Sequence, residues 1–360
     1  MNSVFCRCCG QLETIPTFEI SSPIRIWPFT SSFIKNVILS KKYQLVVYQC
    51  AKCGLVQLQH FELKFIKKLY RGEYLNQTSD NTLRLKSIGN IINLIENQKI
   101  RYLDIGGASN PVLINNSRVI RYSVDPGIKE QSKYEIRKTI EDFETNKTFH
   151  IISMFHTLEH LENPRKILFK LREMLEINGR LIIEVPNLEY YLSRLPYYTF
   201  FHQHITVYSK STLYNLVQKC GFTIEKDAST DEVLYLVLML SPNQTIETLN
   251  FELFDFQKIF SRFRKSLIQK VKDLDNFSIY GAGGSTTLLL NHFKFLTHNL
   301  FKVYDQDKRK IGKYIPGQKV KVCAPPKGIL MEPTLFLSRN IFDLVKKDLE
   351  IQAPIILEDF

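Results

Sequence analysis

The sequence predicts an α/β protein in three parts, and three observations support this prediction. Five of the seven cysteines lie within the first 53 residues, strands and helices alternate through the middle of the chain, and a second, shorter strand–glycine turn–helix–strand unit follows. Strands that alternate with helices form a mostly parallel, doubly wound sheet. We therefore expect a cysteine-rich module at residues 1–72, a central sheet domain at 73–243 and a smaller Rossmann-like α/β domain at 244–360.

The composition is typical of a globular protein, because 44% of the 360 residues are hydrophobic and 23% are charged. The net charge is +12, but the basic residues are scattered among acidic ones, which favours a solvated surface over a nucleic-acid partner. The longest apolar run, residues 233–240, is too short for a membrane helix. The first residues lack a basic segment followed by an apolar one, so we expect no leader peptide. We expect a cytoplasmic protein that binds neither nucleic acid nor membrane.

The amino-terminal module contains two Cys-x-x-Cys-Gly knuckles, which begin at Cys6 and at Cys50. Two intervening residues let both sulfurs of a tight turn face one tetrahedral ion, and the glycine lets the turn close. The predicted ligands of a structural zinc ion are Cys6, Cys9, Cys50 and Cys53. Cys8 could replace one of them only by breaking the spacing. The alternative is a set of reduced thiols in a small core; a disulfide framework is disfavoured.

The central region begins with a helix, because apolar residues recur at helical spacing between Leu83 and Ile95. Pro164 opens a second helix that Asn178-Gly179 ends, and Ser209 caps a third that Gly221 ends. Strands are predicted at residues 101–105, 122–124, 151–155 and 180–185, followed by an antiparallel pair at 223–226 and 233–240.

A candidate cofactor site lies where the first of these strands runs into Gly106-Gly107. Asp125, 21 residues beyond Asp104, ends the next strand. Ligands bind at the carboxyl ends of such strands, and an acid about 20 residues after the glycine turn can bind both ribose hydroxyls. Ala108 breaks the Gly-x-Gly-x-x-Gly pattern, which argues against a nicotinamide dinucleotide. The alternative is an ordinary strand-to-helix turn.

His156-x-x-Glu159-His160 matches an inverted zinc-protease motif. That chemistry requires both histidines and the glutamate on one helix. Here they span a strand end and a loop, and Pro164 begins the helix only afterwards, so we reject this interpretation.

Residues 149–164 and 175–187, with their Leu-Glu-His-Leu-Glu-Asn-Pro segment, resemble the fourth and fifth strands of class I S-adenosylmethionine (SAM)-dependent methyltransferases. The resemblance implies a class I methyltransferase core with SAM as cofactor. It assigns the cofactor-binding role to Asp104, Gly106, Gly107, Asp125, Pro126, Asp142 and His156.

Nearly the whole chain resembles the deoxysugar C-methyltransferases. The matching motifs are Cys-Arg-x-Cys-Gly near the start, Cys-x-x-Cys-Gly-Leu-Val-Gln-Leu at 50–58, Phe-His-Gln-His at 201–204, Tyr-Gly-Ala-Gly-Gly at 280–284 and Lys-Ile-Gly-Lys-Tyr-Ile-Pro-Gly at 310–317. Members of this family have a zinc-binding amino-terminal domain, a central SAM domain and a Rossmann-like carboxy-terminal domain. They methylate C3 of a nucleotide-linked 4-keto sugar.

The resemblance also implies the catalytic residues. The family carries a Tyr-His-Glu-His motif whose last histidine, a candidate general base, matches His204; His202 and Gln203 occupy the two positions before it, and Phe201 replaces the tyrosine. An earlier family histidine matches His160, and a tyrosine after the zinc module resembles Tyr74. Because a neutral Gln203 cannot raise the basicity of His204 as glutamate would, either the base is weaker or the acceptor differs.

We therefore expect a SAM-dependent methyltransferase that acts on a carbon of a nucleotide-linked keto-deoxysugar by histidine-assisted proton removal. Two alternatives are an O- or N-methyltransferase acting on a sugar or related metabolite, and an inactive nucleotide-sugar-binding scaffold. The glycine turn at 280–285 could bind a nucleotide diphosphate at a helix amino terminus, whereas the resemblance implies a structural and substrate-orienting role. We expect a monomer.

Overall fold

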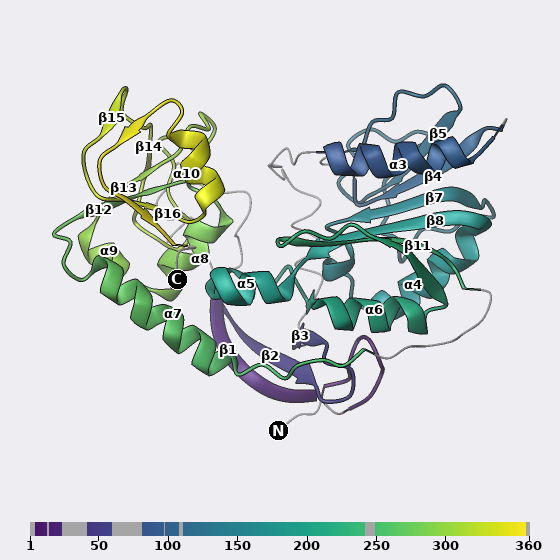
Figure 1. The fold of residues 1–360 in the computed structure, drawn as a ribbon, viewed down its shortest axis with the longest axis horizontal. Coiled ribbons are helices and arrows are strands. Elements are labelled where there is room, and N and C mark those ends of the chain that lie inside the picture. The colour runs from purple at the N-terminus through teal and green to yellow at the C-terminus, as the bar shows by residue number, and fades with distance from the viewer. Residues whose placement is uncertain are drawn as a thin grey trace. The chain divides into compact units, whose positions relative to one another are not determined.

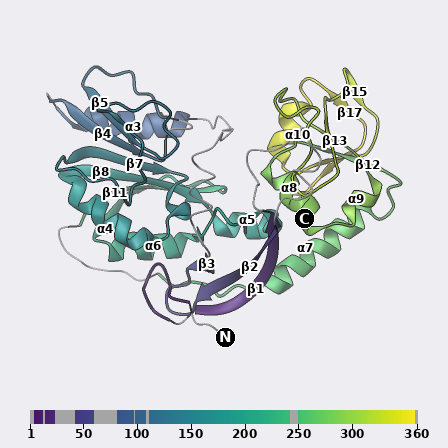
Figure 2. The same cartoon turned by 180° about the vertical axis from the view of Figure 1, so that it is seen from behind.

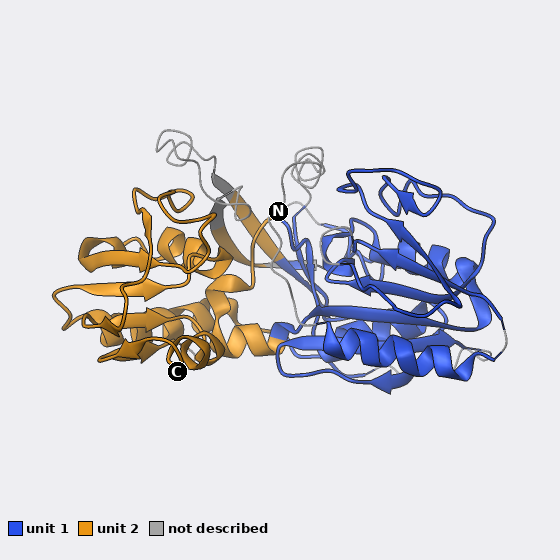
Figure 3. Ribbon diagram, turned by 90° about the horizontal axis from the view of Figure 1, so that it is seen from above, with its two compact units in different colours: residues 1–16, 48–188, 203–253 blue, residues 17–47, 189–202, 254–360 orange. Residues whose placement is uncertain are grey.

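The computed structural model describes residues 4–12, 14–23, 42–59, 81–96, 98–107, 111–241 and 249–357. Two compact units share the chain (Figure 3). The first unit comprises Met1–Pro16, Tyr48–Leu188 and Gln203–Leu253, and the second comprises Thr17–Val47, Glu189–His202 and Phe254–Phe360. Within the described residues, no helix has the length and apolar character needed to cross a membrane. The domain boundaries at 72 and 243 stay predictions.

The first unit is built on a seven-stranded sheet with the order β10-β11-β8-β7-β4-β5-β6 (Figure 1). All neighbours are parallel except β11, which runs antiparallel to both β8 and β10. This confirms the doubly wound sheet and its antiparallel final pair. The strands are β4 (Ile100–Ile105), β5 (Val119–Val124), β6 (Glu135–Ile136), β7 (Phe149–Phe155), β8 (Leu175–Pro186), β10 (Phe222–Asp227) and β11 (Val233–Leu240).

Helices cover both faces of this sheet, with α3 (Thr82–Leu94) on one face and α4 (Pro164–Met174) and α6 (Lys210–Lys219) on the other (Figure 1). The alternation of β4 shows why both faces need cover. Tyr102 is buried in the core beneath α3, whereas Leu103 is buried in the core beneath α4 and α6. A strand that is apolar on both sides is typical of a parallel sheet between two helical layers.

The helix ends follow the predicted caps with one exception. Asn163 accepts a hydrogen bond from the Lys166 backbone N–H, and Ser209 forms a capping box with Thr212. The helix that opens at Pro164 was expected to include Leu175 and to stop at Asn178-Gly179, but it ends at Met174 and β8 begins at Leu175. Leu175 instead pairs with Phe149 of β7, so sheet pairing overrides the helical spacing.

A second, four-stranded sheet has the order β1-β2-β3-β9. Its strands are β1 (Thr14–Pro23), β2 (Lys42–Cys50), β3 (Val56–Leu58) and β9 (Thr206–Val207). Within the first unit, β3 pairs antiparallel with β9, with Val56 opposite Val207 and Gln57 opposite Thr206. The cysteine-rich segment is therefore tied to the residues that follow His204.

The second unit contains a five-stranded parallel sheet with the order β14-β13-β12-β16-β18 and a separate β15–β17 pair (Figure 2). Its first strand lies in the middle, as in a Rossmann-like arrangement. The strands are β12 (Phe277–Tyr280), β13 (Leu300–Tyr304), β14 (Val322–Cys323), β15 (Ile329–Leu330), β16 (Thr334–Phe336), β17 (Glu350–Ile351) and β18 (Pro354–Ile356). The remaining helices of the described chain are η1 (Leu158–His160), α5 (Leu188–Arg194), η2 (Pro196–Tyr198), α7 (Phe256–Val271), α8 (Gly284–His292), α9 (Leu296–Asn299) and α10 (Arg339–Val345).

Candidate active site and metal centre

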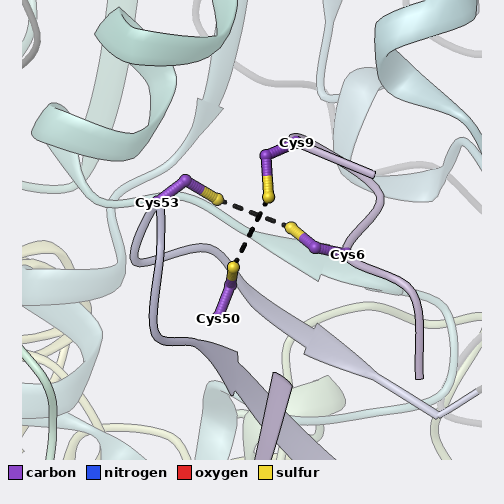
Figure 4. Close-up of side chains that lie close together, drawn as sticks. All are labelled: Cys6, Cys9, Cys50 and Cys53. Atoms are coloured by element: carbon purple, nitrogen blue, oxygen red, sulfur yellow. Dashed lines mark hydrogen bonds between the residues drawn. The ribbon is translucent and has the colours of Figure 1, made fainter. Parts of the chain in front are cut away.

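The four predicted zinc ligands converge on one point (Figure 4). The Sγ atoms of Cys6 and Cys53 lie 3.5 Å apart, those of Cys9 and Cys50 lie 3.6 Å apart, and all four fall within 4.8 Å of one another. Zinc–sulfur bonds of about 2.3 Å in a tetrahedron require sulfur–sulfur separations of roughly 3.8 Å. The cluster therefore fits a zinc ion.

Both knuckles use the same backbone turn. Gly10 N–H donates to the Cys6 carbonyl at 2.8 Å, and Gly54 N–H donates to the Cys50 carbonyl at 2.9 Å. The two glycines have φ angles of 75° and 74°, in the left-handed region that favours glycine. The hydrogen bond to Cys50, together with burial, raises the pKa of the Cys6 and Cys53 thiols when no cation is bound. A bound cation would stabilise the thiolates and so lower these pKa values again.

Gln57 of β3 holds the first knuckle in place. Its buried side-chain amide accepts from the Arg7 backbone N–H at 2.9 Å and donates to the Phe5 carbonyl at 2.9 Å. The Arg7 guanidinium donates to the Leu58 carbonyl at 2.6 Å. The knuckle is thus fastened to the strand that pairs with β9.

The glycine turn after β4 is required by the packing around it. Gly106 has a φ of 78°, and a Cβ there would lie 2.2 Å from Oγ1 of Thr157. A Cβ on Gly107 would lie 2.3 Å from Oδ2 of Asp104. Asp104 is buried and fixed by an ion pair with Arg121 at 2.8 Å and a hydrogen bond from Ser153 at 3.1 Å. The Asp104 carboxylate therefore occupies the space that a side chain at position 107 would need.

Asp125 follows the end of β5 and lies beside this turn, because Ile105 pairs with Val124 and Gly106 N–H donates to the Val124 carbonyl at 3.0 Å. Its Oδ1 accepts from Gly127 N–H at 2.6 Å, so the side chain closes its own turn around the half-buried Pro126. An acid beside a glycine turn at the carboxyl ends of parallel strands fits a ribose-binding position. Asp142 lies in an exposed turn, where its Oδ2 accepts a hydrogen bond from the Thr139 hydroxyl at 2.9 Å.

His156 is the first residue after β7, on the same edge of the sheet. It has a φ of 47°, an uncommon conformation for a residue other than glycine. Its Nε2 lies 2.9 Å from Glu184 Oε1, and the Glu184 carboxylate also pairs through two bonds with the buried guanidinium of Arg84. The sequence interpretation assigned no role to Glu184 or Arg84, although an acid inside the apolar run of β8 is itself a signal of a buried ion pair.

The charge state of this pair follows from its contacts. Desolvation alone would lower the pKa of His156, but the carboxylates of Glu159 and Glu184 raise it to about 9. Desolvation would raise the pKa of Glu184, but His156 and Arg84 lower it to about 2. His156 therefore stabilises the fold fully below its ordinary value of 6.5, and this contribution is lost as the pH rises through about 9.

His160 and His204 lie close together, with ring centroids 5.0 Å apart. Nδ1 of His160 lies 2.7 Å from the backbone carbonyl of Gln203. Because a carbonyl oxygen only accepts, Nδ1 carries the proton and Nε2 of the neutral ring is the basic nitrogen. Glu159, His160 and His204 also offer ligand atoms within 4.8 Å of one another.

Of the other predicted catalytic residues, Tyr74 is outside the described residues. His202 and Phe201 are buried residues of the second unit, and the Phe201 ring stacks on Tyr198 with centroids 5.7 Å apart. The phenylalanine at this position is therefore part of that unit's core. Gln203 is buried in the first unit and contacts His160 through its backbone.

Two family models match the chain. A methyltransferase domain matches residues 74–227, and a C-methyltransferase C-terminal domain matches residues 239–344. The chain therefore contains a methyltransferase domain followed by a C-methyltransferase C-terminal domain, and its central sheet has the class I methyltransferase α/β fold.

Similar proteins include a curated relative and several solved structures. Over 61 residues the methyltransferase is 36% identical to the mitochondrial ubiquinone biosynthesis O-methyltransferase of Schizosaccharomyces pombe, covering 17% of this chain and 22% of that protein. It thus spans about a fifth of that relative's length. A SAM-dependent methyltransferase from Clostridium acetobutylicum is 12% identical with a TM-score of 0.34, covering 45% of this chain and 96% of that one. The plantazolicin methyltransferase BpumL is 13% identical with a TM-score of 0.34, covering 45% and 84%.

In the second unit of the methyltransferase, the glycine turn after β12 is occupied by a side chain of the protein itself. Asp305 Oδ2 accepts from Ala282 N–H at 2.8 Å and pairs with Lys310 Nζ at 2.8 Å, and its Oδ1 accepts from Asp307 N–H at 2.8 Å. An acid that binds a cofactor ribose needs free oxygens. These contacts favour a structural role for the turn.

Proposed function

We propose that this methyltransferase methylates a carbon atom of a nucleotide-linked keto-deoxysugar, with His204 as the general base. The observation that carries the proposal is the His160–His204 pair on the edge of the sheet that also holds the glycine turn. Thr157, which packs on Gly106, is three residues from His160, so the base and the cofactor turn belong to one local structure. The family model for a C-methyltransferase carboxy-terminal domain supports carbon as the acceptor.

The chemistry requires a base and an electrophile. A hydrogen on the carbon beside a ketone is acidic because the resulting carbanion is delocalised as an enolate. His204 takes this proton and becomes an imidazolium, and the enolate electron pair forms the new carbon–carbon bond. When bound, SAM would supply the methyl group as a sulfonium electrophile, with S-adenosylhomocysteine as the second product. The imidazolium then returns its proton to water, which balances the reaction.

The proposal is tested by following the substrate carbon, because proton removal needs no methyl donor. We expect a nucleotide-linked 4-keto sugar in D₂O to exchange its α-hydrogen for deuterium when S-adenosylhomocysteine fills the cofactor site, measured by NMR. With SAM, the product should carry a new carbon–carbon bond. A substrate that is methylated at oxygen or nitrogen, with no deuterium at carbon, would contradict the proposal.

A second candidate is an O-methyltransferase acting on a sugar or related metabolite. The curated relative is named an O-methyltransferase, and the neutral Gln203 stands where a carboxylate would strengthen the base. The bond formed in the product distinguishes the two functions. A scaffold without activity would bind the nucleotide sugar and yield no methylated product.

We further propose that SAM lies over Gly106 and Gly107 with Asp125 on its ribose hydroxyls. Asp125→Ala removes charge-assisted hydrogen bonds of about 1.5–3 kcal/mol, so we expect a roughly 10–150-fold weaker SAM affinity by titration calorimetry. Asp125→Asn keeps an acceptor for Gly127 N–H and isolates the loss of charge. Glu130→Ala, at an exposed acid five residues on, is the matched control. Unchanged affinity in both Asp125 variants would place the ribose elsewhere.

The four-cysteine cluster is proposed as a structural zinc site. All four sulfurs are committed to the ion, so no coordination position is left for a substrate. The monomeric state and the cytoplasmic location stay predictions.

A further inference from the structure

Glu159 is a buried acid for which the site described so far gives no role. Its side chain is 1% exposed, and neither carboxylate oxygen has a hydrogen-bond donor within the described structure. A carboxylate taken out of water costs several kcal/mol unless charges or donors replace the solvent. The side chain therefore requires compensation from its neighbours.

The groups that face Glu159 are His156, His160, His204 and Tyr208. Its Oε1 lies 3.5 Å from His156 Nδ1 and 3.9 Å from His160 Nε2. Burial alone would raise the pKa of Glu159, but the nearby imidazoles of His160, His156 and His204 lower it. The carboxylate is therefore ionised and lies beside the basic nitrogen of His160.

On its other side, Glu159 continues a row of alternating charges. Arg84 from α3 pairs with Glu184 from β8, Glu184 pairs with His156, and His156 faces Glu159. The signs run positive, negative, positive, negative. The next group in this row, the His160–His204 pair, is the position where a positive charge is favoured by Coulomb attraction.

We propose that Glu159 is a positioning residue for proton transfer, the counter-ion of the imidazolium that forms on the His160–His204 pair. The inference rests on the proposed function, in which that pair accepts a proton from carbon. Gln203 is neutral and offers His160 only a backbone carbonyl. Glu159 therefore provides the negative charge that residue 203 lacks.

The same three residues could in principle hold a divalent cation, since their ligand atoms lie within 4.8 Å of one another. The position of His156 favours a proton on the His160–His204 pair over a divalent cation. A divalent ion would lie beside a second, protonated imidazole 3.5 Å from the shared carboxylate, whereas a single proton on the pair completes the alternation.

The test compares Glu159→Gln with the wild-type enzyme in the deuterium exchange assay across pH. Removing the negative charge weakens the base, so the pH at which exchange reaches half its plateau should fall by about one unit or more. The plateau rate should fall about tenfold or more, with SAM affinity unchanged. Gln203→Glu added to Glu159→Gln should move the midpoint back up. Glu162→Gln, the same change at an exposed acid three residues on, should have no effect.

A readout that needs no catalysis separates this inference from the proposed function. The ring-carbon NMR signals of His160 and His204 report where each imidazole titrates. We expect at least one midpoint to fall in Glu159→Gln and neither to move in Glu162→Gln. If wild-type enzyme exchanges no deuterium, the proposed function is wrong, and these midpoints still decide the role of Glu159.

Two outcomes would overturn the inference. One is that both histidine midpoints are unchanged in Glu159→Gln. The other is a second zinc ion per chain that is lost in Glu159→Gln but retained in Glu162→Gln, which would make Glu159 a metal ligand.

Discussion

Replacement of His204 by Asn is expected to lower the rate of deuterium exchange at the substrate α-carbon by about 10²–10⁴-fold, the contribution of a positioned general base. Asparagine keeps a polar side chain of similar reach but cannot accept a proton near neutral pH. SAM affinity should be retained, because the glycine turn packs against Thr157 and Asp104. Exchange is followed by NMR and SAM affinity by calorimetry.

His298→Asn is the control for this variant, since His298 is an exposed histidine of the second unit. It should exchange deuterium at the wild-type rate. If exchange persists in His204→Asn but is lost in His160→Asn, the base is His160, and His204 orients the substrate. If both variants lose SAM binding along with exchange, the histidine pair supports the cofactor site itself.

The strands and helices of the central sheet domain could be predicted because local signals mark each element. The glycine turn at Gly106, the acid at Asp125 and the cap at Ser209 each act within a few residues. The start of β8 could not be predicted, because Leu175 fits the apolar face of a helix as well as it fits the pairing with Phe149. That choice depends on a strand more than 20 residues away.

The same limit applies to the candidate site. The histidines and the cofactor turn carry sequence motifs, but the charge row does not. Arg84, Glu184 and Glu159 come from α3, β8 and η1, and Arg84 and Glu184 are 100 residues apart. A buried arginine on a helix and a buried acid in a strand each hint at a partner; only the fold identifies which one. Glu159 was visible in the sequence as part of a protease-like motif, and rejecting that motif left it without a role.

The pairing of β3 with β9 was likewise absent from the sequence interpretation. Short strands from residues 56–58 and 206–207 have no pattern that links them, yet Leu58 N–H donates to the Ile205 carbonyl at 3.0 Å. The strand that is fastened to the first knuckle through Gln57 is therefore also fastened to the residue after His204. The cysteine-rich module is thus connected through β3 to the residue beside the proposed base.

Because of this connection, we expect the loss of zinc to have a large effect on both the module and the activity. Purified enzyme should contain one zinc ion per chain by elemental analysis, and Cys53→Ser should abolish it, because structural zinc sites contribute about 10–16 kcal/mol of apparent binding free energy at neutral pH. Cys8→Ser should keep the ion, since Cys8 is outside the four-sulfur cluster. Cys323→Ser, at a half-buried cysteine of the second unit, is the control.

The consequence for catalysis follows from the contacts. Without the ion the two knuckles lose the bond that joins them, and Arg7 and Gln57 no longer hold β3 in a fixed position. Amide hydrogen exchange should then increase in β3 and in β9 together, and deuterium exchange at the substrate carbon should fall, while strands β4 and β5 remain protected. A zinc-free chain whose cysteines are freely reactive, with protected β9 amides and full exchange activity, would contradict both the metal site and its link to His204. If the ion is lost and β3 opens but β9 stays protected, the zinc stabilises its own module alone.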